Sequence, residues 1–302
     1  PATADALGVD ALHVKDEGAT PTGSVRDRGA AAAVSAARAA GHGSVVSAAA
    51  GDGGVALAAH AARAGLDAAV YLPSRARFDA KAAVNVHGAD MTVVRGRLGD
   101  AREAAADADG RDCSPFASPW YHDALGGVGA ELLDDGDPER GRPIPDHVVL
   151  PVADGGLYVG LDAVLPDSIG LHAVQPAGCA PVVEAAGSDA VAEPGDVAVD
   201  SPDTVVGELE DPAPPAGSEA VAALRRRDGG AVAVEDGAVL DRGVDVARCD
   251  GRLPSLAGAA ALEGCARLAD RFDADDAVTV VDPGFGRLDV DGFRSRLMGR
   301  GE

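Results

Sequence analysis

Short apolar strands alternate with alanine-rich helices through the first third of the chain, and this alternation limits the possible folds most strongly. The patterns predict strands at 12–15, 44–48, 68–72 and 91–95, and helices at 24–40, 55–64, 78–87 and 98–106. Ser24 is expected to cap the first long helix, and Gly41 and Gly65 follow two helices where left-handed glycines commonly end them. This order is typical of a parallel sheet covered by helices.

The second half repeats the same alternation with longer interruptions. Strands are predicted at 147–152, 171–175 and 277–281, a helix from about 157, and a further helix–strand pattern from Glu219. Residues 107–145 have an irregular pattern, which indicates a crossover between two domains. Residues 186–217 are rich in Pro, Asp and Gly and predict a long surface loop.

The charge balance restricts the partners of this chain. It has 49 acidic and 26 basic residues, a net charge of -23, and only two lysines, Lys15 and Lys81. Such self-repulsion is tolerable at molar salt, where the Debye length is about 3 Å, so we interpret the composition as an adaptation to a salt-rich cytoplasm. The charge argues against nucleic-acid binding and against anionic membranes, and no segment resembles a membrane span or signal peptide.

The cysteines and histidines show no metal-ligand spacing. Cys113, Cys179, Cys249 and Cys265 are scattered without a C-x-x-C pair, which predicts neither a zinc site nor a disulfide framework. None of the seven histidines lies beside a serine or cysteine in a nucleophile motif. We expect them to be surface or core residues and predict no metal.

Residues 14–31 read VKDEGATPTGSVRDRGAA. This stretch resembles the VKDEG-NPTGSFKDRG signature of threonine synthases and their fold-type II relatives, which use pyridoxal phosphate (PLP). In that family the lysine of SFKDR forms a Schiff base with PLP, and the matching residue here is Arg26. A guanidinium stays protonated, so Arg26 lacks the amine nucleophile that a Schiff base needs.

The segment SAAAGDGGVA at 47–56 resembles the family's CASTGNTSAS loop. The resemblance implies substrate-carboxylate contacts at Lys15, Ala49, Ala50 and Gly51, although both alanines lack the family's hydroxyls. It also places Asp52 where the family has an asparagine at the PLP ring hydroxyl. The helix N-terminus after this loop favours a carboxylate through its free N–H groups.

The segment LPVADGGL at 150–157 resembles the glycine-rich cradle for the PLP phosphate, PVGSGGL or PVGGGGL. The implied cradle residues are Ala153, Asp154, Gly155, Gly156 and Leu157. Asp154 places a carboxylate where the family binds the dianionic phosphate of PLP. Like charges about 4 Å apart cost roughly 1 kcal/mol even in water. We therefore expect weak or lost phosphate binding.

Three further segments extend the resemblance to nearly the whole chain. VQPAGCAPVV at 174–183 resembles VQAEGAAPIV of threonine synthases, a mark of ancestry. The segment DPGFGRLD at 282–289 resembles the family's LTGHGLKD. In this match Pro283 replaces the hydroxyl residue that contacts the pyridine nitrogen of PLP. Shifting the alignment by one residue would bring Asp282 to that position. The segment PFASPWY at 115–121 resembles NSVNPYR, which binds the substrate phosphate in threonine synthases. Pro115, Phe116 and Tyr121 replace the Asn, Ser and Arg of that segment and make the site apolar. O-phosphohomoserine is therefore not the expected substrate.

The resemblance implies an α/β protein with two three-layer αβα domains, mostly parallel sheets and an interdomain cleft. We place a smaller domain at 16–124 and a larger one at 1–15 plus 125–302, without the family's N-terminal extension. A homodimer, or pairing with an active homologue, is the expected assembly.

Several changed site positions favour a degenerate threonine synthase-like protein with a binding or regulatory role and weak or lost PLP. One alternative is an active lyase or β-replacement enzyme for an amino acid that uses Lys15 or Lys81 as its amine. A second alternative is a small-anion binding module built on Arg26 and the helix after Gly51.

Overall fold

The computed structural model describes residues 2–115, 117–134, 136, 143–188, 197–227 and 229–300. The chain divides into two compact units. Unit 1 combines residues 1–18 with 128–302, and unit 2 consists of residues 19–127. Each unit is built on its own parallel sheet.

Unit 2 contains a four-stranded parallel sheet in the order β4-β3-β2-β5. Its strands are β2 (Ser44–Ala48), β3 (Asp67–Pro73), β4 (Asp90–Val94) and β5 (Arg111–Asp112). Its helices are α2 (Arg26–Ala39), α3 (Asp52–Ala64), α4 (Phe78–Val86) and α5 (Leu98–Ala106), and α6 (Pro119–Asp134) begins in it. Gly65 ends α3 with a φ of 70°, the left-handed conformation expected there.

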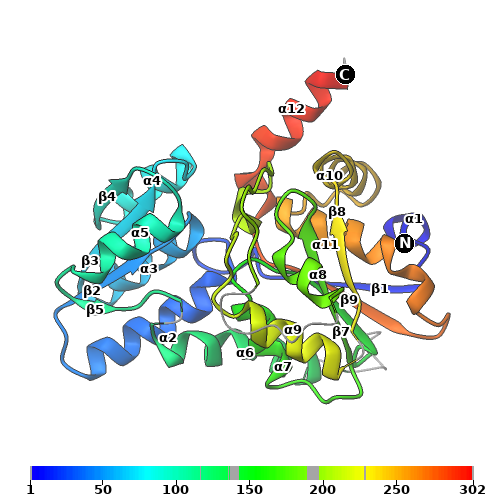
Figure 1. Cartoon of the computed structure of the whole chain (residues 1–302), viewed down its shortest axis with the longest axis horizontal. Helices are drawn as coiled ribbons and strands as arrows, with labels where there is room; N and C mark the ends of the chain where they lie inside the picture. The colour runs from blue at the N-terminus through cyan, green and yellow to red at the C-terminus, as the bar shows by residue number, and fades with distance from the viewer. Residues whose placement is uncertain are drawn as a thin grey trace. The chain divides into compact units, whose positions relative to one another are not determined.

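Alternate residues of β3 face different helices, which makes unit 2 three layers thick. Tyr71 packs in a cluster with Val46 of β2 and Ala101 of α5. Val70 and Leu72 instead lie against Gly54 of α3, where an added Cβ would come within 2.7 Å of Val70. The sheet is therefore covered by α3 on one face and α5 on the other (Figure 1).

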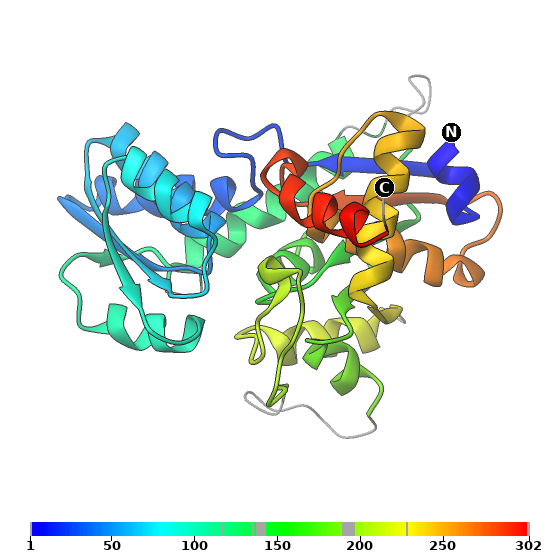
Figure 2. The same cartoon turned by 90° about the horizontal axis from the view of Figure 1, so that it is seen from above.

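Unit 1 contains a five-stranded parallel sheet in the order β1-β9-β6-β7-β8. Its strands are β1 (Ala11–Asp16), β6 (His147–Pro151), β7 (Gly170–Pro176), β8 (Ala231–Val234) and β9 (Ala277–Asp282). Its helices are α1 (Ala2–Leu7), α7 (Gly156–Asp162), α8 (Pro181–Ala186), α9 (Gly217–Arg226), α10 (Asp236–Asp250), α11 (Leu256–Arg267) and α12 (Val290–Arg300). Figure 2 shows β1 and β9 side by side although they come from opposite ends of the chain.

Helix α11 forms the centre of the unit 1 core. Ten of its twelve residues are buried, and it packs along β6, β7, β8 and β9. Gly264 allows this approach, because a Cβ there would lie 2.3 Å from Val174 Cγ2. Tyr158 of α7 donates a hydrogen bond to the Leu171 carbonyl oxygen of β7 at 2.8 Å. A helix with almost no exposed side is typical of a large α/β core.

The predicted α/β class with parallel sheets is confirmed, and two local predictions were wrong. Residues 119–134 form α6 and not an irregular crossover. The start of α2 is capped by Val25 without a side-chain hydrogen bond, although the Arg26 N–H lies 3.3 Å from Ser24 Oγ. Helix α6 contains a Gly-Gly pair of low helix propensity, and burial of Tyr121 and Leu125 outweighs that propensity.

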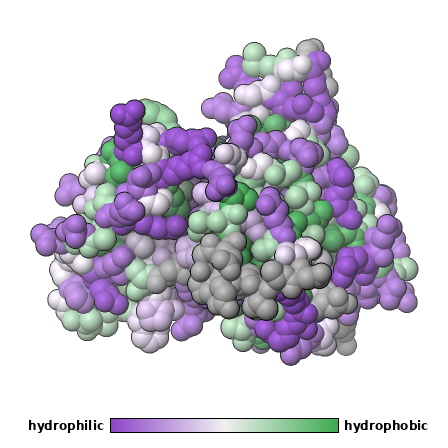
Figure 3. Space-filling model, in the orientation of Figure 1, coloured by the Kyte–Doolittle hydropathy of each residue, from purple (hydrophilic) through white to green (hydrophobic). Residues whose placement is uncertain are grey.

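Hydrophilic side chains are spread over much of the visible surface of both units (Figure 3). Within the described ranges, no helix is long and apolar enough to cross a bilayer. The same part of the chain holds no group of three or more His, Cys, Asp or Glu side chains suited to a metal ion.

Candidate functional site

The first turn of α2 is organised by Asp27, a residue that the sequence motifs did not single out. Its Oδ2 accepts hydrogen bonds from the N–H of Thr22 at 2.8 Å and from the Thr22 hydroxyl at 2.9 Å. Its Oδ1 lies 2.9 Å from Nε2 of His60 on α3. Burial alone would raise the pKa of Asp27, but these hydrogen bonds outweigh burial and lower it. The turn that precedes Arg26 is thus fixed by an ionised carboxylate.

Arg26 is the first residue of α2, and Asp52 is the first residue of α3. Asp52 is preceded by Gly51, the N-cap of α3, and its Oδ1 lies 3.4 Å from Arg77 Nη2. Burial raises the pKa of Asp52, and the charges of Arg77 and Arg26 oppose that rise. Arg26 and Asp52, predicted from separate motifs, therefore share one electrostatic environment in unit 2.

The two alanines before this helix present only methyl groups. Ala49 is buried and donates its N–H to the Tyr71 carbonyl oxygen at 3.1 Å, whereas Ala50 is exposed. Tyr121 is a core residue whose hydroxyl lies 3.5 Å from the Arg26 carbonyl oxygen. Pro115 is half-buried, and Phe116, also assigned to the apolar substrate site, lies outside the described residues.

In unit 1, the turn after β6 carries the predicted cradle. Asp154 is buried, and its Oδ1 accepts the N–H of Gly156 at 2.9 Å. Gly155 has a φ of 86°, and a Cβ there would lie 2.9 Å from the Ala216 carbonyl oxygen. Only glycine suits this left-handed, crowded position. Ala153 and Leu157 flank the turn, with Leu157 buried as the second residue of α7.

The end of β9 holds a buried ion pair that sequence reasoning missed. Asp282 is 1% exposed, and its Oδ2 lies 2.7 Å from Arg252 Nη2. Its Oδ1 accepts the hydroxyl of Ser255 at 2.6 Å, and Ser255 Oγ in turn accepts the N–H of Gly258. Burial raises the pKa of Asp282, and Ser255 and Arg252 oppose the rise. Pro283 follows directly and is half-buried.

Arg252 also joins the ends of neighbouring strands. Its Nη1 lies 3.0 Å from Oδ2 of Asp16, which is the register partner of Asp282 in the β1–β9 pair. Strands β6 and β9 are neighbours too, so the turn at 153–157 and the residues at 282–283 follow the same carboxyl edge of one parallel sheet. Ligands of open α/β sheets commonly bind at that edge.

Both lysines are engaged. Lys15 Nζ lies 2.5 Å from Glu131 Oε2 and 3.9 Å from Glu17 Oε1, all in unit 1. Lys81 Nζ donates to the Ser74 carbonyl oxygen at 2.7 Å, within unit 2.

A family model described as pyridoxal-phosphate dependent enzyme matches residues 1–284. The chain belongs to this family of PLP-dependent enzymes. It is 29% identical to threonine synthase of Methanosarcina acetivorans, over 93% of this chain and 71% of that protein. It is 30% identical to threonine synthase of Mycobacterium tuberculosis, over 86% of this chain and 71% of that protein.

Solved structures of fold-type II PLP enzymes share the fold at lower identity. An L-serine ammonia-lyase from Rhizomucor miehei has a TM-score of 0.81 at 18% identity, covering 98% of this chain and 95% of its own. Threonine deaminase isoform 2 from Solanum lycopersicum has a TM-score of 0.79 at 20% identity, covering 98% of this chain and 84% of its own. At these identities the likeness establishes the fold alone.

Proposed function

We propose that this threonine synthase-like family member binds a ligand or regulates a partner and does not carry out ordinary PLP catalysis. The observation that carries the proposal is Arg26 at the start of α2, in the motif position of the family's Schiff-base lysine. A guanidinium does not lose its proton at accessible pH, so it does not attack an aldehyde carbon.

The two lysines offer poor substitutes for that amine. Lys15 is half-buried, and its ammonium group is occupied by an ion pair with Glu131 at 2.5 Å. Lys81 is held by a backbone carbonyl oxygen of Ser74, at the first turns of α4. This arrangement argues against the active lyase or β-replacement alternative.

The cradle residues do not fit a PLP phosphate. A phosphate needs free N–H groups, but the Gly156 N–H is already donated to Asp154 Oδ1. A bound dianion would also face the buried Asp154 carboxylate, and Coulomb repulsion grows as solvent is excluded. A reaction step through bound PLP is therefore not part of the proposed function.

The other predicted contacts favour the same conclusion. Asp282, the acid that could have served the pyridine nitrogen, is engaged by Arg252 and Ser255. The small-anion alternative at Arg26 is opposed by Asp52, whose carboxylate interacts with that guanidinium. A dimer, or a pair with an active homologue, remains part of the proposal because a non-catalytic subunit needs a partner to act on.

The test is visible absorbance after PLP is added at molar KCl, followed by borohydride reduction and peptide mass mapping. We expect neither a Schiff-base band nor a covalent adduct. With only two lysines in the chain, an adduct on either would be assigned easily, and such an adduct on Lys15 or Lys81 would overturn the proposal in favour of a relocated amine.

Designed variants test the assignment of the two changed positions. Arg26→Lys combined with Asp154→Gly supplies both an amine and an open turn, and we expect it to gain a reducible PLP band. The matched control, Arg28→Lys with Asp154→Gly, adds an amine two residues further along α2 and should stay colourless. Equal bands in both double variants would contradict the special role of position 26.

A further inference from the structure

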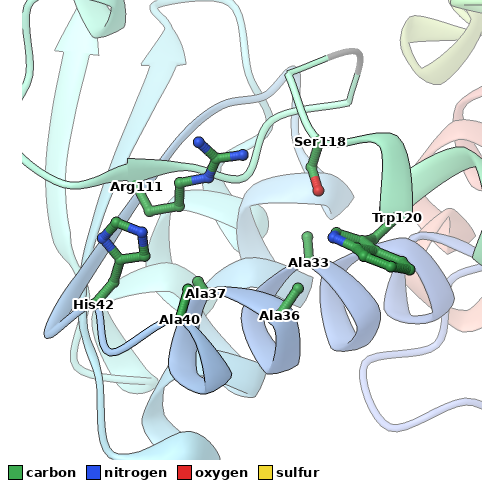
Figure 4. A pocket seen from close by; sticks show the side chains of 8 residues that line it. All are labelled: Ala33, Ala36, Ala37, Ala40, His42, Arg111, Ser118 and Trp120. Carbon is green, nitrogen blue, oxygen red and sulfur yellow. The ribbon is translucent and has the colours of Figure 1, made fainter.

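Unit 2 has a hollow of about 290 Å³ on the later turns of α2, separate from the groups at the start of that helix (Figure 4). Ala33 and Ala37, both buried, belong to its floor. From Arg26 to Ala37 the helix rises roughly 16 Å. The hollow is therefore distinct from the site that the family motifs predict.

Hydrogen-bond donors converge on this alanine floor from three elements. Arg111 comes from β5, His42 follows α2, and Trp120 lies in the first turn of α6 (Figure 4). Ser118, just before α6, is only 3% exposed, and its hydroxyl points into the hollow. This hydroxyl can therefore donate a hydrogen bond to a small ligand that enters the hollow.

The charge of the hollow is opposite to that of the whole chain. No acidic residue lines it, although the chain carries 49 acids and 26 bases. Among the described residues Arg111 forms no ion pair. Its neighbour Asp112 is engaged elsewhere, accepting the Ser114 N–H at 2.8 Å. A guanidinium left without a carboxylate in so acidic a protein provides a planar, bidentate donor for one.

We propose that this hollow binds a small organic monocarboxylate with a flat apolar body. The carboxylate would meet the Arg111 guanidinium and the Ser118 hydroxyl. The body would lie on the alanine floor beside the Trp120 indole, which is 55% exposed. An apolar floor with a few polar groups is the common design of small-molecule sites. This proposal is independent of the PLP question.

The test uses benzoate as the probe and Trp120, the only tryptophan of the chain, as the reporter. Benzoate is titrated at constant KCl, with equilibrium dialysis to confirm the fluorescence change, beside titrations with acetate and inorganic phosphate. We expect saturable binding with benzoate at least about tenfold tighter than acetate, because acetate lacks the apolar body. The absence of saturable benzoate binding, or equal binding of phosphate, would overturn the proposal.

Variants locate the binding. Arg111→Gln should weaken benzoate binding at least about tenfold, and Ser118→Ala should weaken it several-fold, by loss of charged and neutral hydrogen bonds respectively. The control Arg63→Gln removes the same charge from the exposed end of α3, and should change affinity less than twofold. Circular dichroism checks that each variant is folded. An equal loss in Arg63→Gln would mean that net charge alone governs the effect and would refute the site.

Discussion

At the scale of single residues, two histidines of unit 1 form a chain of hydrogen bonds. His172 is 2% exposed, and its Nδ1 accepts the Gly230 N–H at 2.8 Å. Its Nε2 lies 3.0 Å from His147 Nδ1, and His147 Nε2 lies 3.1 Å from Asp276 Oδ2. Because Gly230 occupies His172 Nδ1, the neutral ring donates from Nε2 to His147, which donates to Asp276. Both rings are satisfied when neutral.

This arrangement predicts a loss of stability in acid. Burial, and then the neighbouring His147 and Arg271, lower the pKa of His172 from 6.5 to about 3. As pH falls, His172 therefore takes up a proton in the unfolded chain before it does so in the folded chain. The stabilisation of the folded state by neutral His172 is complete above about pH 6.5 and is lost as pH falls toward 3. His172→Asn keeps an acceptor for Gly230. It should cost about 1–2 kcal/mol of unfolding free energy at pH 8, and less at pH 5. Urea denaturation at both pH values measures the difference, and a constant or widening gap would contradict this account.

At the scale of elements, α2 and α6 meet through a glycine. A Cβ at Gly29 would lie 2.4 Å from the ring of Tyr121, which is 1% exposed. Two helices approach closely only where one offers no side chain, and a buried aromatic ring has little freedom to move aside. The glycine of the RDRG segment is thus required by packing in this fold.

Gly29→Ala should therefore destabilise the protein by about 1–3 kcal/mol, the usual cost of overpacking. The control is Gly99→Ala in α5, where nothing lies within 4 Å of the added Cβ. That change should be neutral or stabilising by up to about 1 kcal/mol, because alanine favours a helix. Thermal unfolding of the two variants compares them directly. A neutral Gly29→Ala would show that the two helices separate easily.

At the scale of the whole molecule, the main feature is the large excess of acidic residues. A net charge of -23 on 302 residues means strong repulsion among exposed carboxylates at low ionic strength. Many arginines are already paired, as Arg227 is with Asp162 and Arg242 with Glu263. The chain carries 49 acidic and 26 basic residues, so we expect the folded state to depend on counterions.

We expect Tm to rise throughout the range from about 0.1 M to 2 M KCl. The rise should be steepest at the low end, where the Debye length changes fastest with salt concentration. Differential scanning fluorimetry measures this, with equal osmolality of sucrose as the uncharged control. A rise of the same size in sucrose would show that solvent exclusion and not charge screening stabilises the chain.

Local sequence accounts for most of the elements of this protein and for the positions of its altered motifs. The alternation of apolar segments predicted the parallel sheets, and Arg26, Asp52 and Asp154 were identified as unusual from their motifs alone. Hydrophobic periodicity and turn residues act over a few positions, so they can be recognised in an isolated segment. Helix α6 was not predicted, because buried side chains such as Tyr121 and Leu125, and not local helix propensity, stabilise it.

Only the tertiary structure decided what the altered residues contact. The pairing of Asp282 with Arg252, of Asp27 with His60, and the hollow around Ser118 join residues far apart in the sequence. No local pattern encodes such contacts, because they depend on which helix faces and strand ends the packed fold brings together. The sequence by itself determined the family framework, and it is the source of the hypothesis that Arg26 replaces the family's Schiff-base lysine. Packing determined that, in the turn expected to bind the PLP phosphate, the Gly156 N–H is donated to the Asp154 carboxylate.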